Sequence, residues 1–199
     1  MKNESFLNLP QALLDVKFFA EQDFGVEECR PPHCTRCGVA AGSLGALRIH
    51  GHGCRRRDVW GPPNGCEGTL PTIVELVLRR YRCLECSHVM TIRPPFVARY
   101  FRYATAAIAL AFLLWSVLGH AAGKVRREVS PWLVRGVSEP HRWRSLGRWL
   151  GHLEDLFRLP NRLDDEGRGL ARRVTGLVGS RAPPDLPARV RTFVGAQLR

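Results

Sequence analysis

Lysine is scarce in this sequence: only Lys2, Lys17 and Lys124 are lysines among 30 basic residues, and the others are arginines. Acidic residues are also few, since 18 Asp and Glu leave the 199 residues with a formal net charge of +12. This balance excludes a disordered acidic protein and favours an anionic partner, either nucleic acid or a membrane surface. Arginine is the better ligand for phosphate and guanine, although a GC-rich genome also writes arginine in place of lysine.

An apolar run of bilayer length is missing as well. Residues 104–119 form a run of 16 residues without a charge, whereas about 20 are needed to span a membrane. Basic residues flank the run on both sides, so it lacks the charge asymmetry of a membrane helix. We therefore expect a buried helix and no membrane partner. The N-terminal residues show no apolar core and no cleavage site of a secretory signal, which favours a cytoplasmic protein.

The seven cysteines are odd in number, which argues against a fully paired disulfide framework. They are Cys29, Cys34, Cys37, Cys54, Cys66, Cys83 and Cys86. Four of them form two C-x-x-C pairs, and in a reducing compartment such pairs more often hold metal than form disulfides. Each pair supplies two thiolates from one tight turn, and two pairs complete a zinc tetrahedron. The sequence therefore predicts a zinc ribbon whose Zn²⁺ is bound by Cys34, Cys37, Cys83 and Cys86.

Other roles for the cysteines and histidines stay open. A redox-active C-x-x-C is disfavoured because neither pair sits in a βαβ context. A second metal site is conceivable from Cys54 and Cys66 with His50 or His52, and Cys29 or His33 is an alternative ligand for the first site. A closed four-cysteine site leaves no position for a reactive water, so it is expected to be structural.

The chain is expected to have an α+β fold, with a small zinc-ribbon β-unit followed by a helix-turn-helix-like helical domain. The predicted segments are an acidic N-terminal helical segment (1–28), the zinc ribbon (29–98), the helical domain (99–158) and a basic, weakly helical tail (159–199). Short strands are predicted at 47–50, 72–81 and 89–93. Helices are predicted at 103–118, 123–134 and 139–157, with Pro131 expected to shorten or bend the second.

The third predicted helix has the pattern of a DNA-recognition helix. An apolar stripe follows i, i+3, i+4 spacing and comprises Trp143, Leu146, Leu150, Leu153 and Phe157. Basic and hydroxyl side chains fall on another face, as in a helix-turn-helix motif. The predicted DNA-binding residues are His141, Arg144, Ser145 and Arg148, with Lys124, Arg126 and Arg127 from the preceding helix. Arginines at 55–57, 79, 80 and 82 are further candidates for phosphate contacts, or else a solvated strand edge.

Several motifs together resemble the N-terminal part of bacterial insertion-sequence transposases and small bacterial proteins related to them. The matching pieces are CTRC at 34–37, LRRYRCLEC at 78–86, TIRPPFVARYFRY at 91–103, the apolar helix, VSPW at 129–132 and WRSLGRW at 143–149. The resemblance covers a little over half the chain. It implies that the four paired cysteines bind zinc and that the helix with Arg144, Ser145 and Arg148 reads double-stranded DNA. A separate transposase subunit is then a possible partner.

Catalytic residues of the transposase kind are not evident. Such enzymes hold two metal ions with acidic residues from separate strands, whereas Asp164, Asp165 and Glu166 are adjacent and better fit a helix start. We therefore expect a non-enzymatic protein. One alternative is a compact metal-dependent nuclease or transposase using scattered residues such as Asp58, Glu67 and Glu128. Another is a zinc-ribbon module that docks on protein or RNA. The sequence does not predict the oligomeric state.

Overall fold

The computed structural model describes residues 20, 23–43, 45–61, 72–94, 96–98, 101–130, 143–160 and 166–198. The chain divides into two compact units. The ribbon unit comprises residues 1–58 and 75–95, and the helical unit comprises residues 59–74 and 96–199. The α+β class expected from the sequence is confirmed.

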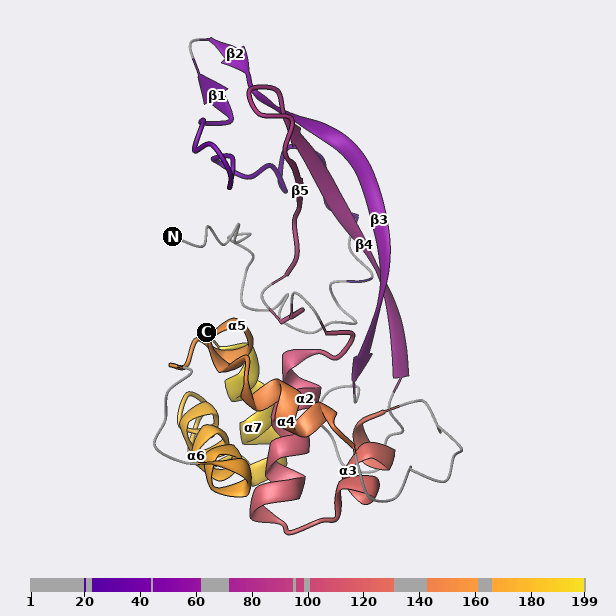
Figure 1. The fold of residues 1–199 in the computed structure, drawn as a ribbon, viewed down its shortest axis with the longest axis vertical. Coiled ribbons are helices and arrows are strands. Elements are labelled where there is room, and N and C mark those ends of the chain that lie inside the picture. Colours follow the sequence, from indigo (N-terminus) through magenta and orange to yellow (C-terminus); the bar gives the residue numbers. More distant parts are fainter. Residues whose placement is uncertain are drawn as a thin grey trace. The chain divides into compact units, whose positions relative to one another are not determined.

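Two small sheets build the ribbon unit. Strands β1 (Gly42–Ser43) and β2 (Ala46–Leu47) pair antiparallel. Strands β3 (Ile49–Gly61), β4 (Thr72–Cys83) and β5 (Val89–Thr91) form an antiparallel sheet in the order β3-β4-β5 (Figure 1). Both long strands continue into the helical unit. The β-branched start of β4 suits a strand, and its Leu76 and Leu78 are buried while the alternate Val77 is exposed.

The core of the ribbon unit is small and rich in cysteine. Its buried members are Cys29, Cys34, Ile49, Tyr81, Cys83, Met90 and Ile92. Residues 23–30, here called the strap, pack on this core. The Arg79 Nε donates to the Phe24 carbonyl at 2.8 Å, and the Tyr81 hydroxyl donates to the Val26 carbonyl. The predicted helix in residues 1–28 lies almost wholly outside the described residues, and the strap was not foreseen.

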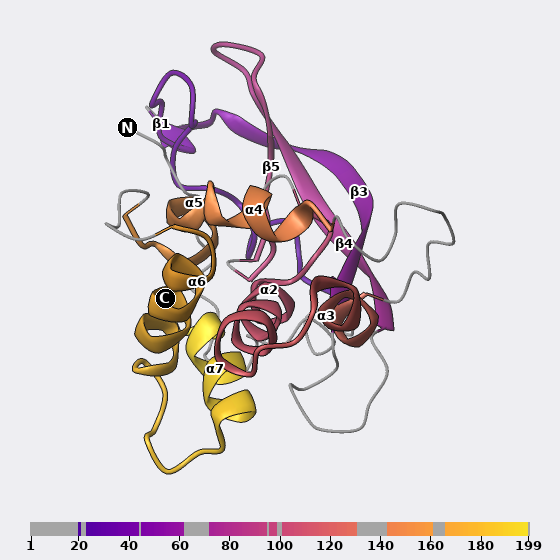
Figure 2. The ribbon, with the colours of Figure 1, turned by 60° about the horizontal axis from the view of Figure 1, so that its bottom comes forward.

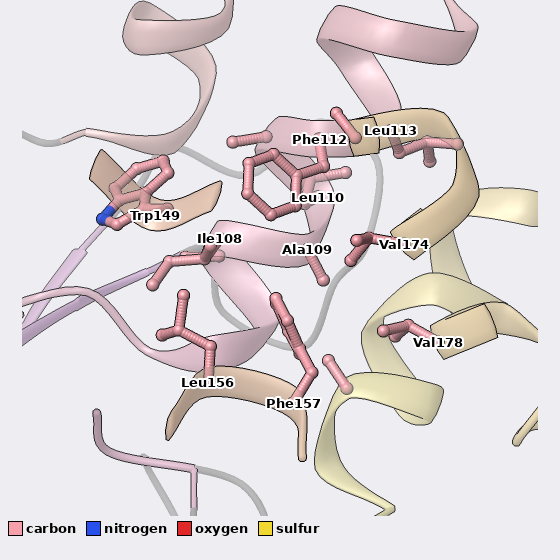
Figure 3. Close-up of a cluster of buried hydrophobic side chains, with 14 of the residues drawn as sticks. Ile108, Ala109, Leu110, Phe112, Leu113, Trp149, Leu156, Phe157, Val174 and Val178 are labelled. Atoms are coloured by element: carbon pink, nitrogen blue, oxygen red, sulfur yellow. The ribbon is translucent and has the colours of Figure 1, made fainter. Parts of the chain in front are cut away.

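The helical unit is built around one central helix. Helix α2 (Thr105–Phe112) is buried at all eight positions, as its apolar sequence TAAIALAF requires. Around it lie α3 (Ala122–Val129), α4 (Ser145–Leu150), α6 (Gly167–Gly179) and α7 (Ala188–Gln197), while α5 (Leu153–Phe157) follows α4 (Figure 2). Side chains from α2, α4, α5 and α6 meet in a single core, among them Ile108, Phe112, Trp149, Phe157 and Val174 (Figure 3).

The apolar run at 104–119 is helical over Thr105–Val117 and buried up to Leu114, as predicted, whereas Val117 and Leu118 at its end are exposed. After α2 the chain continues as a π-helix, η3 (Leu113–Val117). The Ser116 carbonyl, in the last turn, accepts hydrogen bonds from the Arg172 Nε and Nη2 at 3.2 and 2.9 Å. In the described part of the chain no helix is long and apolar enough to cross a membrane.

The second and third predicted helices differ from expectation in their ends. Helix α3 stops at Val129, and Ser130 is extended, as the residue before a proline prefers. The third is two short helices, α4 and α5, separated at Gly151 and His152. Its predicted apolar stripe is nevertheless in the core, with Trp143 partly buried. Residues 131–142 lie outside the described residues.

The C-terminal residues are more than a weakly helical tail. Helices α6 and α7 both contribute to the core of the helical unit, through Leu170, Val174 and Val178 on the first and Phe193 and Ala196 on the second. The i, i+4 spacing of the α6 residues makes a narrow apolar stripe. Because prolines and arginines surround this stripe, the sequence predicted only weak helices here. Packing on α2 stabilises the two helices.

Candidate metal centre

Two turns of the same geometry hold the paired cysteines. In the first, the Cys34 N–H donates to the Val39 carbonyl at 2.9 Å, and Gly38 has a left-handed φ of 76°. In the second, the Cys83 N–H donates to the carbonyl of His88 at 2.9 Å, and Ser87 has a φ of 57°. Gly38 takes this conformation without strain. The C-x-x-C sequence therefore folds locally into two matching knuckles.

The four sulfur atoms converge. All four Sγ atoms of Cys34, Cys37, Cys83 and Cys86 lie within 4.8 Å of one another. Two of the pairs, Cys34 with Cys86 and Cys37 with Cys83, are 3.6 Å apart. A zinc tetrahedron with Zn–S bonds of about 2.3 Å has edges of about 3.8 Å. The spacing therefore fits one tetrahedral ion, and the four-cysteine group predicted from the sequence is confirmed as a group that can hold a metal.

The pKa values of Cys34, Cys37 and Cys86 indicate that the four thiols cannot all be ionised at neutral pH without a bound cation. Burial raises the pKa of Cys34, but the backbone N–H groups of Cys37 and Arg36 and neighbouring thiols lower it to about 7. At Cys37 the N–H of Val39 lowers the pKa, while desolvation and three surrounding thiols raise it to about 12. At Cys86 the His88 N–H and the Cys37 thiol lower the pKa, but desolvation with the Cys34 and Cys83 thiols raises it overall. Four thiolates therefore need a metal ion to coexist.

The centre is set into the ribbon core on one side. Cys34 and Cys83 are buried, Cys86 is half-buried and Cys37 is exposed. Four thiolates fill a tetrahedron and leave no open position for water or substrate. A metal bound here would cross-link the two knuckles, which are 46 residues apart between Cys37 and Cys83. A metal held by all four thiolates would therefore have a structural role.

The other sulfur and imidazole groups that the structure describes do not join this centre. Cys29 is buried in the ribbon core, where desolvation raises its pKa and keeps it a thiol. His33, His50, His52 and Cys54 are exposed, and among the described residues only the four paired cysteines form a group of three or more possible ligands. The conceivable second site also required Cys66, which lies outside the described residues.

The predicted DNA-binding residues fall on α3 and α4. On α3, Lys124 and Arg127 are exposed and Arg126 is half-buried, while Val125 and Val129 face the core. The Lys124 Nζ lies 3.3 Å from the His120 Nε2.

On the other helix, Arg144 is at the N-terminal boundary of α4 and exposed, and Ser145 is its first residue. The Arg148 guanidinium lies over the Phe101 ring, 5.8 Å from its centroid. His141 lies outside the described residues.

Tyr103 contacts the end of α3 and the start of α4. Burial raises its pKa, while a hydrogen bond with the Ser130 side chain and the nearby Arg126 lower it. Its ring meets Trp143 and Trp149 edge-on, with centroids 6.4 and 5.0 Å apart. These contacts tie the C-terminal end of α3 to Trp143, just before α4, and to Trp149 near the end of α4. No spacing in the sequence indicated these contacts of Tyr103, because Arg126, Ser130, Trp143 and Trp149 are all 23 or more positions away.

A charged cluster missed by the sequence reasoning anchors α3 to α7. The Glu128 carboxylate accepts a hydrogen bond from the Arg189 Nη2 at 2.7 Å, and its other oxygen lies 3.2 Å from the His120 Nδ1. Arg189 is 61 positions from Glu128, so no local spacing in the sequence predicts this ion pair. Glu128, one of the carboxylates considered for catalysis, is thus engaged in a structural ion pair.

The fold and the centre define the class: an α+β protein with a four-cysteine group that can hold a metal ion. Comparison with protein-family models, with curated proteins and with solved structures finds no match to this chain.

Proposed function

We propose that the chain is a zinc-containing DNA-binding protein in which the four-cysteine centre is structural. The convergence of four thiols within 4.8 Å carries the first half of the proposal. Zinc is the metal that prefers four thiolates in a closed tetrahedron. The site needs reduced cysteines, which favours a reducing compartment such as the cytoplasm.

Metal analysis tests the zinc centre. Protein purified without chelator should contain about one Zn²⁺ per chain. Cys83→Ser should lose it, because Cys83 is a buried ligand. Cys54→Ser is the matched control, since Cys54 is exposed and outside the group. Zinc-free wild-type protein, or equal zinc loss in both variants, would contradict the assignment.

The DNA-binding half rests on the exposed basic groups of the helical unit. Lys124 and Arg127 on α3 and Arg144 before α4 are exposed, and Tyr103 connects the two helices through Ser130 and Trp143. Arginine and lysine in such positions neutralise phosphates, and arginine also forks onto guanine. This supports duplex DNA as the partner, with Arg144 and Arg148 as the residues for base contacts.

Binding to fluorescent DNA duplexes tests this half. Affinity should be measurable at about 50 mM salt and fall steeply as salt rises. Arg144→Ala and Arg148→Ala should reduce the preference for one sequence over others, whereas Arg127→Ala should weaken binding to all sequences alike. Arg191→Ala on α7 serves as the control. Absence of any affinity at about 50 mM salt would refute DNA binding.

A catalytic step is not part of the proposal. Among the described residues, Glu128 is paired with Arg189, and no group of three or more carboxylate or imidazole ligands is present. The pure protein should therefore leave supercoiled DNA intact in magnesium. Nicking that disappears on changing Asp58 or Glu128 would favour the compact-nuclease alternative instead.

We also propose descent from a transposase, on the motifs given above. A reading frame for a catalytic domain beside this gene would support that origin, and an unrelated operon would count against it.

A further inference from the structure

The sheet of the ribbon unit has two faces of opposite character. On β4, Tyr81 is buried and pairs with buried Met90 on β5. This face lies under the strap, because the Tyr81 hydroxyl and the Arg79 Nε both bond to strap carbonyls. Side chains alternate between the faces of a strand. The neighbours of Tyr81 on β4, half-buried Arg80 and exposed Arg82, are therefore on the opposite face. Earlier in the strand that face is covered, since Leu76 and Leu78 are buried, so only its end near the knuckle is open.

Strand β3 adds two imidazoles to that opposite face. Ile49 is buried in the same cluster as Tyr81. A Cβ on Gly51 would lie 3.1 Å from the Val26 side chain, so position 51 also faces the strap. By alternation His50 and His52 face the other way, and both are exposed. Gly53 then has a φ of 74°, which interrupts the alternation before the arginines at 55–57.

The resulting outer face has six positions: His50 and His52 on β3, Arg80 and Arg82 on β4, and Val89 and Thr91 on β5. None of the six is acidic. In contrast, Arg79 on the strap side is committed to the Phe24 carbonyl and to Asp23, 3.3 Å away. Of the described residues, no carboxylate is within ion-pair distance of Arg80 or Arg82, and Arg82 only donates to the Ser87 hydroxyl at 3.3 Å.

We propose that this outer face, with Arg80 and Arg82 at its centre, binds the phosphodiester backbone of DNA. Two arginines of one face without acidic neighbours complement a row of phosphates, and the His52 ring N–H and the Thr91 hydroxyl can donate beside them. The His50 Nε2 is instead bonded to the Leu47 carbonyl at 2.9 Å. A sheet can lie on a duplex in this way without reading bases. The inference rests on the proposed DNA binding. It adds phosphate contacts from the ribbon unit to those proposed for α3 and α4.

The test compares salt dependence of binding among three double variants. Arg80→Gln with Arg82→Gln removes two charges from the face. Arg168→Gln with Arg191→Gln removes the same two charges from α6 and α7 and is the matched control. Arg80→Lys with Arg82→Lys keeps the charge and loses the fork. Zinc content near one per chain verifies that each variant has kept its metal centre.

Two lost phosphate contacts lower the slope of log affinity against log salt by about 1.8, at about 0.9 for each contact. Between about 50 and 200 mM salt, wild-type affinity should therefore fall about 12-fold more than that of the glutamine variant. The loss should be the same for unrelated duplex sequences. The lysine variant and the α6–α7 control should keep the wild-type slope.

Three outcomes overturn the inference or its basis, and they are distinguishable. Wild-type protein that does not bind DNA refutes the proposed function itself. Wild-type binding with an unchanged slope in the glutamine variant refutes the role of the outer face only. An equal drop in the α6–α7 control shows that net charge, and not this face, sets the affinity.

Discussion

At the scale of the residue, part of the preference for arginine over lysine is explained by hydrogen bonds within the folded chain. Arg79 donates to the Phe24 carbonyl, Arg172 to that of Ser116, and the Arg181 Nη2 to that of Phe157 at 2.7 Å. A guanidinium offers several donors in a fixed fork and so can satisfy backbone carbonyls at the ends of turns and helices. These arginines stabilise the fold, which leaves a smaller set for an anionic partner than the net charge suggests.

The cysteine pKa values predict how metal binding depends on pH. Metal binding needs thiolates, so protons compete with the metal and affinity rises with pH. At neutral pH Cys34, with a pKa of about 7, is partly ionised, whereas Cys37, with a pKa raised to about 12, is protonated. Zinc binding should therefore release at least the protons of Cys37 and Cys86 near pH 7, and affinity should fall by at least about a hundredfold for each pH unit downward.

Competition with a chelator of known affinity, repeated at several pH values between about 6 and 8, measures this dependence. A proton count in weak buffer gives an independent value. Affinity that is unchanged over this range would mean that the thiols are already ionised without metal, contrary to the raised pKa of Cys37 and Cys86.

At the scale of the element, sequence patterns predicted those elements whose conformation depends on neighbouring residues in the chain. The two C-x-x-C knuckles form because a tight turn with a left-handed residue follows each pair, and the apolar sequence of α2 requires burial on all sides. The strap and the π-helix could not be predicted in this way. Arg79 and Phe24 are 55 positions apart, and Arg172 and Ser116 are 56 apart, so only the folded chain brings them together.

The crossing of α6 and α7 depends on one small residue, Gly195. A Cβ built on Gly195 would lie 2.0 Å from the Val178 carbonyl oxygen on α6, which is backbone and cannot rotate away. Gly195→Ala should therefore force the helices apart and destabilise the helical unit by about 2–4 kcal/mol. Gly176 on α6 is the matched control, since a Cβ there meets nothing within 4 Å.

Gly176→Ala should instead stabilise the protein by about 0.5–1 kcal/mol, because alanine loses less backbone entropy in a helix. Thermal or urea unfolding, followed by helical circular dichroism, measures both changes. Equal and small effects of the two substitutions would show that α6 and α7 do not cross at Gly195.

At the scale of the whole molecule, the two units draw their stability from different sources. Three of the seven buried members of the ribbon core are cysteines, and two of these are proposed metal ligands. Among the described residues, the core of the helical unit contains no cysteine and consists of aliphatic and aromatic side chains, including Trp149, Phe112 and Phe157. A core as small as that of the ribbon unit commonly needs a metal or a disulfide to be stable.

Removing the metal should therefore unfold one unit and spare the other. With a strong chelator under reducing conditions, amide hydrogen exchange should lose protection in β4 and β5 around Cys83, while α2 and α6 keep theirs. Helical circular dichroism should change little, because all the described helices of eight or more residues belong to the helical unit. Cys83→Ser without chelator should give the same exchange pattern. If protection disappears from α2 together with β4, the two units fold as one cooperative structure, and the metal centre stabilises the whole chain rather than the ribbon alone.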